Sequence, residues 1–160
     1  MEYIFLKMMR IIGIDLGEKR IGIAVTDKLN KISYPLTVIE NNSTTKEKLL
    51  KIIKDYDIGK IVIGIPYNLK GEAGYQTKKV NDFIYENFKD LNIQVKLMDE
   101  RFTSKIAESI LGKTGEINRK VFKKKQVSFK KGDIDKLSAS ILLNDYLKRV
   151  EKVKTEEYKK

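Results

Sequence analysis

Three acidic residues stand where predicted strands end or where a predicted helix begins. Asp15 lies near the end of the first apolar run, Glu100 follows the fifth such run by two residues, and Asp135 lies near the start of the last helical pattern. In sheets with parallel strands, the carboxyl ends of the strands form the edge at which ligands bind. We therefore expect the three carboxylates to converge at one edge of the sheet.

Converging carboxylates would repel one another, which would raise their pKa values unless a cation neutralised them. Mg²⁺ is a fitting cation because it prefers hard oxygen ligands and keeps bound waters, and Mn²⁺ accepts the same ligands. Two ions about 4 Å apart stabilise the attacking and leaving oxygens of a displacement at phosphorus. The chain has no Cys and no His, which excludes thiolate zinc sites and imidazole bases. The expected chemistry is metal-assisted phosphodiester hydrolysis, with Asp15, Glu100 and Asp135 as metal ligands and catalytic residues.

Each of these acids also has a simpler structural interpretation. An Asp at a strand end often serves a turn, a Glu beside Arg101 can form a surface ion pair, and an Asp at a helix start is commonly a cap. Taken singly, these roles are the more common ones. The order of the three acids along successive elements is what favours a shared site.

Several cationic and polar residues near these acids could hold a nucleic-acid backbone. Lys19 and Arg20 follow the first strand in a predicted hairpin turn, and Arg101 could bind a phosphate through two parallel hydrogen bonds. Asn68 lies in the loop after the fourth strand. The alternatives are that Arg101 pairs with Asp99 and that the Asn68 loop is only a tight turn.

Positive charge is concentrated in residues 113–131, which combine many cations with two phenylalanines. The whole chain carries 33 Lys and Arg against 22 Asp and Glu, a formal net charge of +11. Such fields attract polyanions, and basic tracts with interleaved rings suit phosphate contacts plus base stacking. A lysine-rich surface and a merely solvated loop are the alternatives. We expect Lys123, Lys124 and Lys125 to bind nucleic acid.

The elements that must position these residues can be read from apolar patterning. Three predicted strands come first, and helices and strands then alternate. This order predicts an α/β fold with a mixed five-stranded sheet and helices on both faces. The strands are expected over residues 10–16, 20–26, 32–40, 60–65 and 93–98.

Local signals refine this arrangement. Pro35 suits an edge strand because proline cannot donate to a ladder, and the run over 60–65 is apolar without alternation, as in a central parallel strand. Residues 44–47 form a capping box that should begin the first helix. Asp133 is expected to cap the last helix, which should end at about Val150.

At 160 residues the chain matches one domain, expected over 9–150. Residues 1–8 are interpreted as an N-terminal extension and 151–160 as a charged C-terminal tail. The opening apolar stretch is too short to span a bilayer and is followed by no signal-type cleavage site, so a cytoplasmic location is expected. The oligomeric state is left open between monomer and homodimer.

Four stretches of the chain resemble the signature motifs of one family. They read MRIIGIDLGEKRIG from position 9, IGIPYNLKG from 63, DERFTS from 99 and IDKLSA from 134. In order and spacing they are similar to the YqgF family, RuvC-like Holliday junction resolvases also described as nucleases that mature the precursor of 16S ribosomal RNA. The resemblance implies an RNase H-like fold, a nucleic-acid substrate and an association with ribosomal particles. It carries the acidic residues of the family onto Asp15, Glu100 and Asp135.

Two other functions compete with a nuclease that processes precursor ribosomal RNA or branched DNA. One is a non-catalytic RNA-binding factor in ribosome biogenesis, whose acidic cluster has lost its activity. The other is an actin-like ATPase, because the GIDLG sequence after a strand resembles a phosphate loop of sugar kinases. That class needs a second comparable domain, for which 160 residues leave no room.

Overall fold

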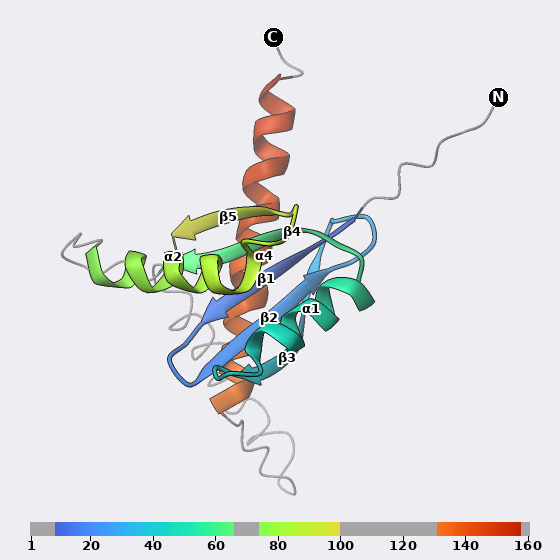
Figure 1. Ribbon diagram of the computed structural model, residues 1–160. Helices are drawn as coiled ribbons and strands as arrows, with labels where there is room; N and C mark the ends of the chain where they lie inside the picture. The colour runs from blue at the N-terminus through green and yellow to red at the C-terminus, as the bar shows by residue number, and fades with distance from the viewer. Residues whose placement is uncertain (1–8, 66–73, 100–130, 158–160) are drawn as a thin grey trace, which may run out of the picture.

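The computed structural model describes residues 9–65, 74–99 and 131–157. Within these ranges the chain forms five strands and three helices (Figure 1). The elements are β1 (Arg10–Leu16), β2 (Arg20–Thr26), β3 (Ser33–Glu40), α1 (Thr45–Asp55), β4 (Ile58–Ile65), α2 (Gly74–Phe88), β5 (Gln94–Asp99) and α4 (Lys131–Glu157).

All five strands join one mixed sheet in the order β3-β2-β1-β4-β5. β1 pairs antiparallel with β2, as does β2 with β3, whereas β1 with β4 and β4 with β5 are parallel. The predicted mixed five-stranded sheet is confirmed. Pro35 lies on the edge strand β3, beside a register shift between Ile23 and Ala24, which agrees with its inability to donate a ladder hydrogen bond.

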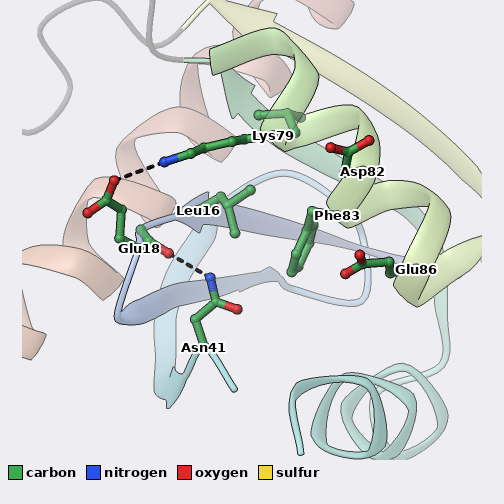
Figure 2. Close-up of a pocket in the computed structure, with 9 residues that line it drawn as sticks. Leu16, Glu18, Asn41, Lys79, Asp82, Phe83 and Glu86 are labelled. Atoms are coloured by element: carbon green, nitrogen blue, oxygen red, sulfur yellow. Dashed lines mark hydrogen bonds and ion pairs between the residues drawn. The ribbon is translucent and has the colours of Figure 1, made fainter. Parts of the chain in front are cut away.

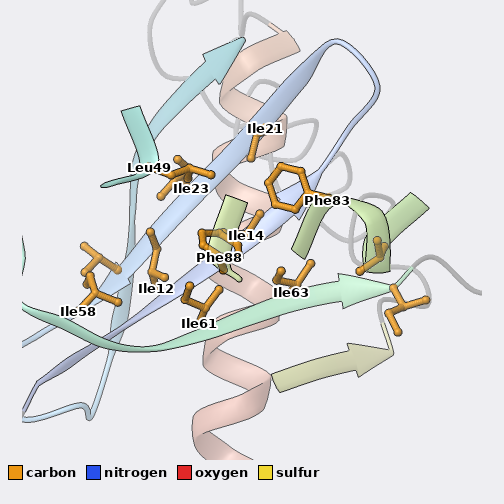
Figure 3. Packing of buried hydrophobic residues seen from close by; sticks show 13 residues of the cluster. Ile12, Ile14, Ile21, Ile23, Leu49, Ile58, Ile61, Ile63, Phe83 and Phe88 are labelled. Atoms are coloured by element: carbon orange, nitrogen blue, oxygen red, sulfur yellow. The ribbon is translucent and has the colours of Figure 1, made fainter. Parts of the chain in front are cut away.

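Helices cover both faces of the sheet, α1 and α2 on one and α4 on the other (Figure 1). Strands β1 and β4 are therefore buried on both sides, which explains their apolar central runs, residues 11–14 in β1 and 61–65 in β4. Figure 3 shows the larger core, on the α1 and α2 face, where each buried Ile or Phe side chain contributes about 1.5–3 kcal/mol. Its central members are Ile12, Ile14, Ile21, Ile23, Leu49, Ile61, Ile63, Phe83 and Phe88.

The second core lies under α4, along a stripe of small and apolar residues at helical spacing. Ser138, Ala139, Leu142 and Tyr146 of that stripe are all buried. Hydrogen bonds at the sheet edge add to this packing, since the backbone N–H of Ser33 donates to Asn144 Oδ1 at 3.0 Å and its hydroxyl donates to the Ser140 carbonyl at 2.7 Å. The buried stripe fixes how α4 lies on the sheet.

Two helix ends differ in detail from the sequence prediction: α1 begins after Thr44 as expected but without the expected side-chain cap, and α4 ends later than expected. Thr44 makes no side-chain cap to α1, because its backbone is helical rather than extended as a capping residue requires. Its hydroxyl and its backbone N–H are both directed to Asn42 Oδ1, to which they donate at 2.7 and 2.9 Å. Such local side-chain bonds compete with capping. Helix α4 continues past Val150 to Glu157, because the added residues include no Gly or Pro and are rich in Glu and Lys, which favour helix.

A loop at the far end of β2 makes stability depend on pH. Asp27 Oδ1 accepts the backbone N–H groups of Lys31 and Ile32 at 2.7 and 3.0 Å. These bonds, that of Ile32 foremost, hold the pKa of Asp27 below its usual value. A lowered pKa means that ionised Asp27 stabilises the fold above the unfolded value of about 3.9, and that this contribution disappears as pH falls through the folded pKa.

We expect Asp27→Ala to lower the melting temperature at pH 7, and the difference from the unaltered chain to shrink as pH falls below about 4. Thermal unfolding followed by circular dichroism between pH 7 and pH 3 measures this. The Asp27→Asn variant cannot titrate and serves as the control. A difference for Asp27→Ala that stays constant over this range would contradict the assignment.

Candidate active site

Gly22 of β2 is the point at which α4 touches the sheet beside Asp15. Gly22 is the cross-strand partner of Asp15, which places their Cα atoms about 4.5–5.5 Å apart. A Cβ atom on Gly22 would collide with the backbone carbonyl of Asp135. The first turns of α4 therefore lie directly on this glycine, and two acids far apart in the sequence become neighbours.

The carboxylate of Asp15 points to the face that α4 covers. A Cβ atom on Gly13, two residues earlier, would come within 2.9 Å of the Ala139 carbonyl oxygen and of Leu143 Cβ, both in α4. Residues two apart on a strand point to the same face of the sheet. Asp15 and Asp135 thus lie at one end of one face of the sheet.

Asp135 forms an ion pair that sequence reasoning missed. The Arg20 guanidinium donates from Nε to Asp135 Oδ2 at 2.8 Å, with the two side chains 35% and 24% exposed. We expected Arg20 to contact phosphate, but in the structure it contacts a carboxylate. Lys19 is exposed, and its backbone oxygen accepts the N–H of Asn41 at 3.0 Å. One sequence signal for this contact was available. Arg20 and Gly22 are two residues apart in a predicted strand, so both point to the same face of the sheet.

Asp133 does not have the predicted capping position. Helix α4 already includes Lys131, so Asp133 lies inside the first turn. Its carboxylate pairs with Lys136 Nζ at 3.0 Å, one turn along the helix. An acid in the first turn still interacts favourably with the helix dipole, but the expected cap is wrong.

The third proposed acid, Glu100, follows β5 in the sequence and lies outside the described residues. β5 ends at Asp99, which pairs with Ile65 of β4, and β4 lies between β1 and β5 in the sheet. In the part of the chain that the structure describes, no three acidic side chains gather into a metal site. The other candidates outside the described residues are Asn68, Glu100, Arg101, Lys123, Lys124 and Lys125.

A pocket of about 540 Å³ opens at the same end of β1, but on the face covered by α2 (Figure 2). Among the residues that line the pocket, Lys79 Nζ donates to Glu18 Oε1 at 2.9 Å, and Asn41 Nδ2 donates to the Gly17 carbonyl at 2.9 Å. This ion pair lowers the pKa of Glu18. Sequence analysis did not single out Lys79, because nothing in the pattern shows which turn of α2 faces β1. The pocket is lined by Leu16, Gly17, Glu18, Asn41, Lys79, Val80, Asp82, Phe83 and Glu86.

Comparison with known proteins shows the family to which the chain belongs. Residues 9–149 match the family described as "RuvX: Holliday junction resolvase". The chain belongs to the RuvX family. A relative from Sulfurihydrogenibium, named "Putative pre-16S rRNA nuclease", is 44% identical over 146 residues, which cover 89% of this chain and 92% of the relative. A relative of the same name from Natranaerobius thermophilus is 40% identical over 143 residues, 88% of this chain and 95% of that one.

A solved structure supports the fold of this RuvX family member. A fowlpox virus resolvase, crystallised with its Holliday junction DNA substrate, aligns with 89% of this chain and 99% of its own at a TM-score of 0.52 and 15% identity. The predicted RNase H-like fold is confirmed. The family and the names of its members also confirm the expected nuclease class over the non-catalytic alternative.

Proposed function

We propose that this RuvX family nuclease hydrolyses phosphodiester bonds with divalent metal ions held by Asp15, Glu100 and Asp135. The observation that carries the proposal is the seating of Asp135 on Gly22, the cross-strand partner of Asp15. It brings two carboxylates, from opposite ends of the sequence, to one end of the α4 face. Glu100 is proposed as the third ligand because it directly follows β5, two strands from Asp15.

The donor set fits Mg²⁺ or Mn²⁺ because carboxylate oxygens are hard ligands and no softer ligand, Cys or His, occurs in the chain. When bound, such ions supply positive charge for the attacking and leaving oxygens of the scissile phosphate. Asp15 and Asp135 hold this charge at the edge of the sheet. The close packing of α4 on Gly13 and Gly22 keeps the two carboxylates on the same face.

The proposed substrate is the precursor of 16S ribosomal RNA, a substrate that the names of the relatives support. Within it, the proposed cut is the one that matures the 5′ end. Branched DNA is the second candidate, since the family is described by Holliday junction resolution. On the first substrate, ribosomal particles would be partners and the cytoplasm the site of action. The described residues include no helix long and apolar enough to cross a membrane.

A panel of labelled substrates tests this function. Precursor ribosomal RNA, single-stranded RNA and a four-way DNA junction are incubated with Mg²⁺, Mn²⁺ or EDTA. We expect metal-dependent cleavage of the precursor RNA and none in EDTA. Cleavage of the junction alone would assign the protein to recombination, whereas RNA binding without cleavage in any metal would contradict the nuclease and favour a binding factor.

Metal should also stabilise the free protein. A ligand that binds only the folded state raises stability by mass action, by about 2.7 kcal/mol at a hundredfold excess over its dissociation constant, and here it also relieves carboxylate repulsion. We expect millimolar Mg²⁺ or Mn²⁺ to raise the melting temperature, and Asp15→Asn to remove most of this rise. An equal rise in both proteins would place the bound metal elsewhere.

The basic segment is proposed to supply affinity rather than chemistry. Replacing Lys123, Lys124 and Lys125 with Ala should weaken binding of RNA and DNA alike and reduce the slope of log affinity against log salt by about 2 to 3, because fewer counterions are released. Fluorescence anisotropy over a salt series measures both quantities. Lys28, Lys31 and Lys54, which are not candidate contacts, provide a triple-Ala control of equal charge. Unchanged affinity and slope in the first variant would show that the segment does not contact nucleic acid.

A further inference from the structure

Strand β2 provides Asp135 with two different supports on one face. The backbone of Asp135 packs on Gly22. Arg20 lies two residues earlier and so on the same face, and its Nε forms an ion pair with the Asp135 carboxylate at 2.8 Å. The two partners are 115 residues apart in sequence and both are partly buried. The ion pair therefore belongs to the packing of α4 on the sheet and is not a pair between two fully exposed side chains.

This ion pair engages the Asp135 carboxylate, which the proposed function assigns as a ligand of a metal ion. Asp135 Oδ2 accepts the Arg20 hydrogen bond, so part of the negative charge available to a cation is already neutralised. A divalent ion at Asp135 would also stand close to the positive guanidinium, and like charges at short range repel. Arg20 and a metal ion therefore compete electrostatically for the same carboxylate.

We propose that Arg20 is an exchangeable counter-ion of Asp135, which neutralises this carboxylate while the metal is absent and lowers the affinity of the free protein for metal. Arg20 is a positioning residue in this account, since it acts through Asp135. The inference rests on the proposed function, because it takes Asp135 as a metal ligand. It also gives a reason for a cation in an otherwise acidic site: without it, Asp15 and Asp135 would repel each other in the metal-free protein.

The test measures the Mn²⁺ dissociation constant of the free protein from the loss of the free-ion EPR signal. A partly exposed ion pair is worth up to about 1 kcal/mol, so we expect Arg20→Gln to bind Mn²⁺ about two- to fivefold more tightly. Arg20→Lys keeps the charge and should stay within about twofold of the unaltered chain. In an Asp135→Asn background, Arg20→Gln should lose its effect, because the shared carboxylate is gone.

Lys79→Gln is the matched control. It removes a cation whose ion pair, with Glu18 at 2.9 Å, lies near the same end of β1 but on the opposite face. A tighter Mn²⁺ affinity in Arg20→Gln than in Lys79→Gln, with circular dichroism showing both variants folded, supports the exchange. Weaker or unchanged affinity in folded Arg20→Gln and Arg20→Met overturns it. Failure of the unaltered chain to bind Mn²⁺ would instead overturn the proposed metal site itself.

Discussion

Asp135→Asn should lower metal-dependent cleavage by at least about a hundredfold while the protein stays folded and still binds nucleic acid. The substitution removes a metal-ligating charge, which is worth several kcal/mol in the transition state, and each 1.4 kcal/mol is a tenfold change in rate. The shape of the side chain is kept, and its remaining oxygen can still accept the Arg20 hydrogen bond. Because that ion pair is partly exposed, the melting temperature should change by only a few degrees.

Asp133→Asn is the internal control for this experiment. Asp133 lies in the same helical turn and has an ion pair of its own, with Lys136 at 3.0 Å, but residues two apart on a helix point to different sides. Its loss should cost at most about 1 kcal/mol and leave cleavage almost intact. Full activity in Asp135→Asn would end the three-carboxylate mechanism. Loss of activity in a stable Asp133→Asn would show that the other aspartate is the ligand.

Gly22→Ala should reduce stability and cleavage together. The added methyl group collides with the Asp135 carbonyl, which is backbone and cannot turn aside as a side chain would. Overpacking of this kind costs about 1–3 kcal/mol, or roughly 2–12 °C in melting temperature for a chain of this size. Helix α4 must move away from β2, and Asp135 moves with it relative to Asp15. A displacement of about 1 Å at a catalytic group can cost about a hundredfold in rate.

Gly132→Ala separates this packing effect from the general effect of replacing a glycine. A methyl group there would meet Val38 Cγ2 at 3.5 Å, an ordinary contact, and alanine is favoured over glycine inside a helix by about 0.5–1 kcal/mol. Its melting temperature should be equal or higher, with cleavage unchanged. If Gly22→Ala kept the stability and activity of the unaltered chain, then α4 would not be seated on β2 as described.

The strands and their pairing could be predicted because their apolar runs, turns and crossovers are local signals. The position of Pro35 on an edge strand is one example, and the unbroken run of β4 is another. The stripe on α4 was predictable for the same reason, since Ser138, Ala139 and Leu142 repeat at helical spacing. Each of these patterns depends on residues that are close together in the sequence, so each could be recognised without the tertiary structure.

Features that depend on tertiary competition could not be predicted. The capping box at Thr44 fails because the Thr44 backbone is already helical and its hydroxyl is directed to Asn42 rather than to the first turn of α1. The cap at Asp133 fails because α4 already includes Lys131. For the candidate site, the juxtaposition of Asp15 and Asp135 was expected, but the Arg20 ion pair joins residues 115 positions apart, and no local pattern records such a contact.

The central claim is that Asp15, Glu100 and Asp135 surround one metal centre. Fe²⁺ bound in place of Mg²⁺, with ascorbate and peroxide, produces hydroxyl radicals that cut the chain near the metal, and mass spectrometry locates the cuts. We predict cuts in three separate segments, around residues 15–22, 99–101 and 133–136, all suppressed by excess Mg²⁺ and lost in Asp15→Asn. Cuts confined to one of these segments, or clustered around Lys79 and Glu86 in the pocket on the opposite face, would contradict the three-carboxylate centre.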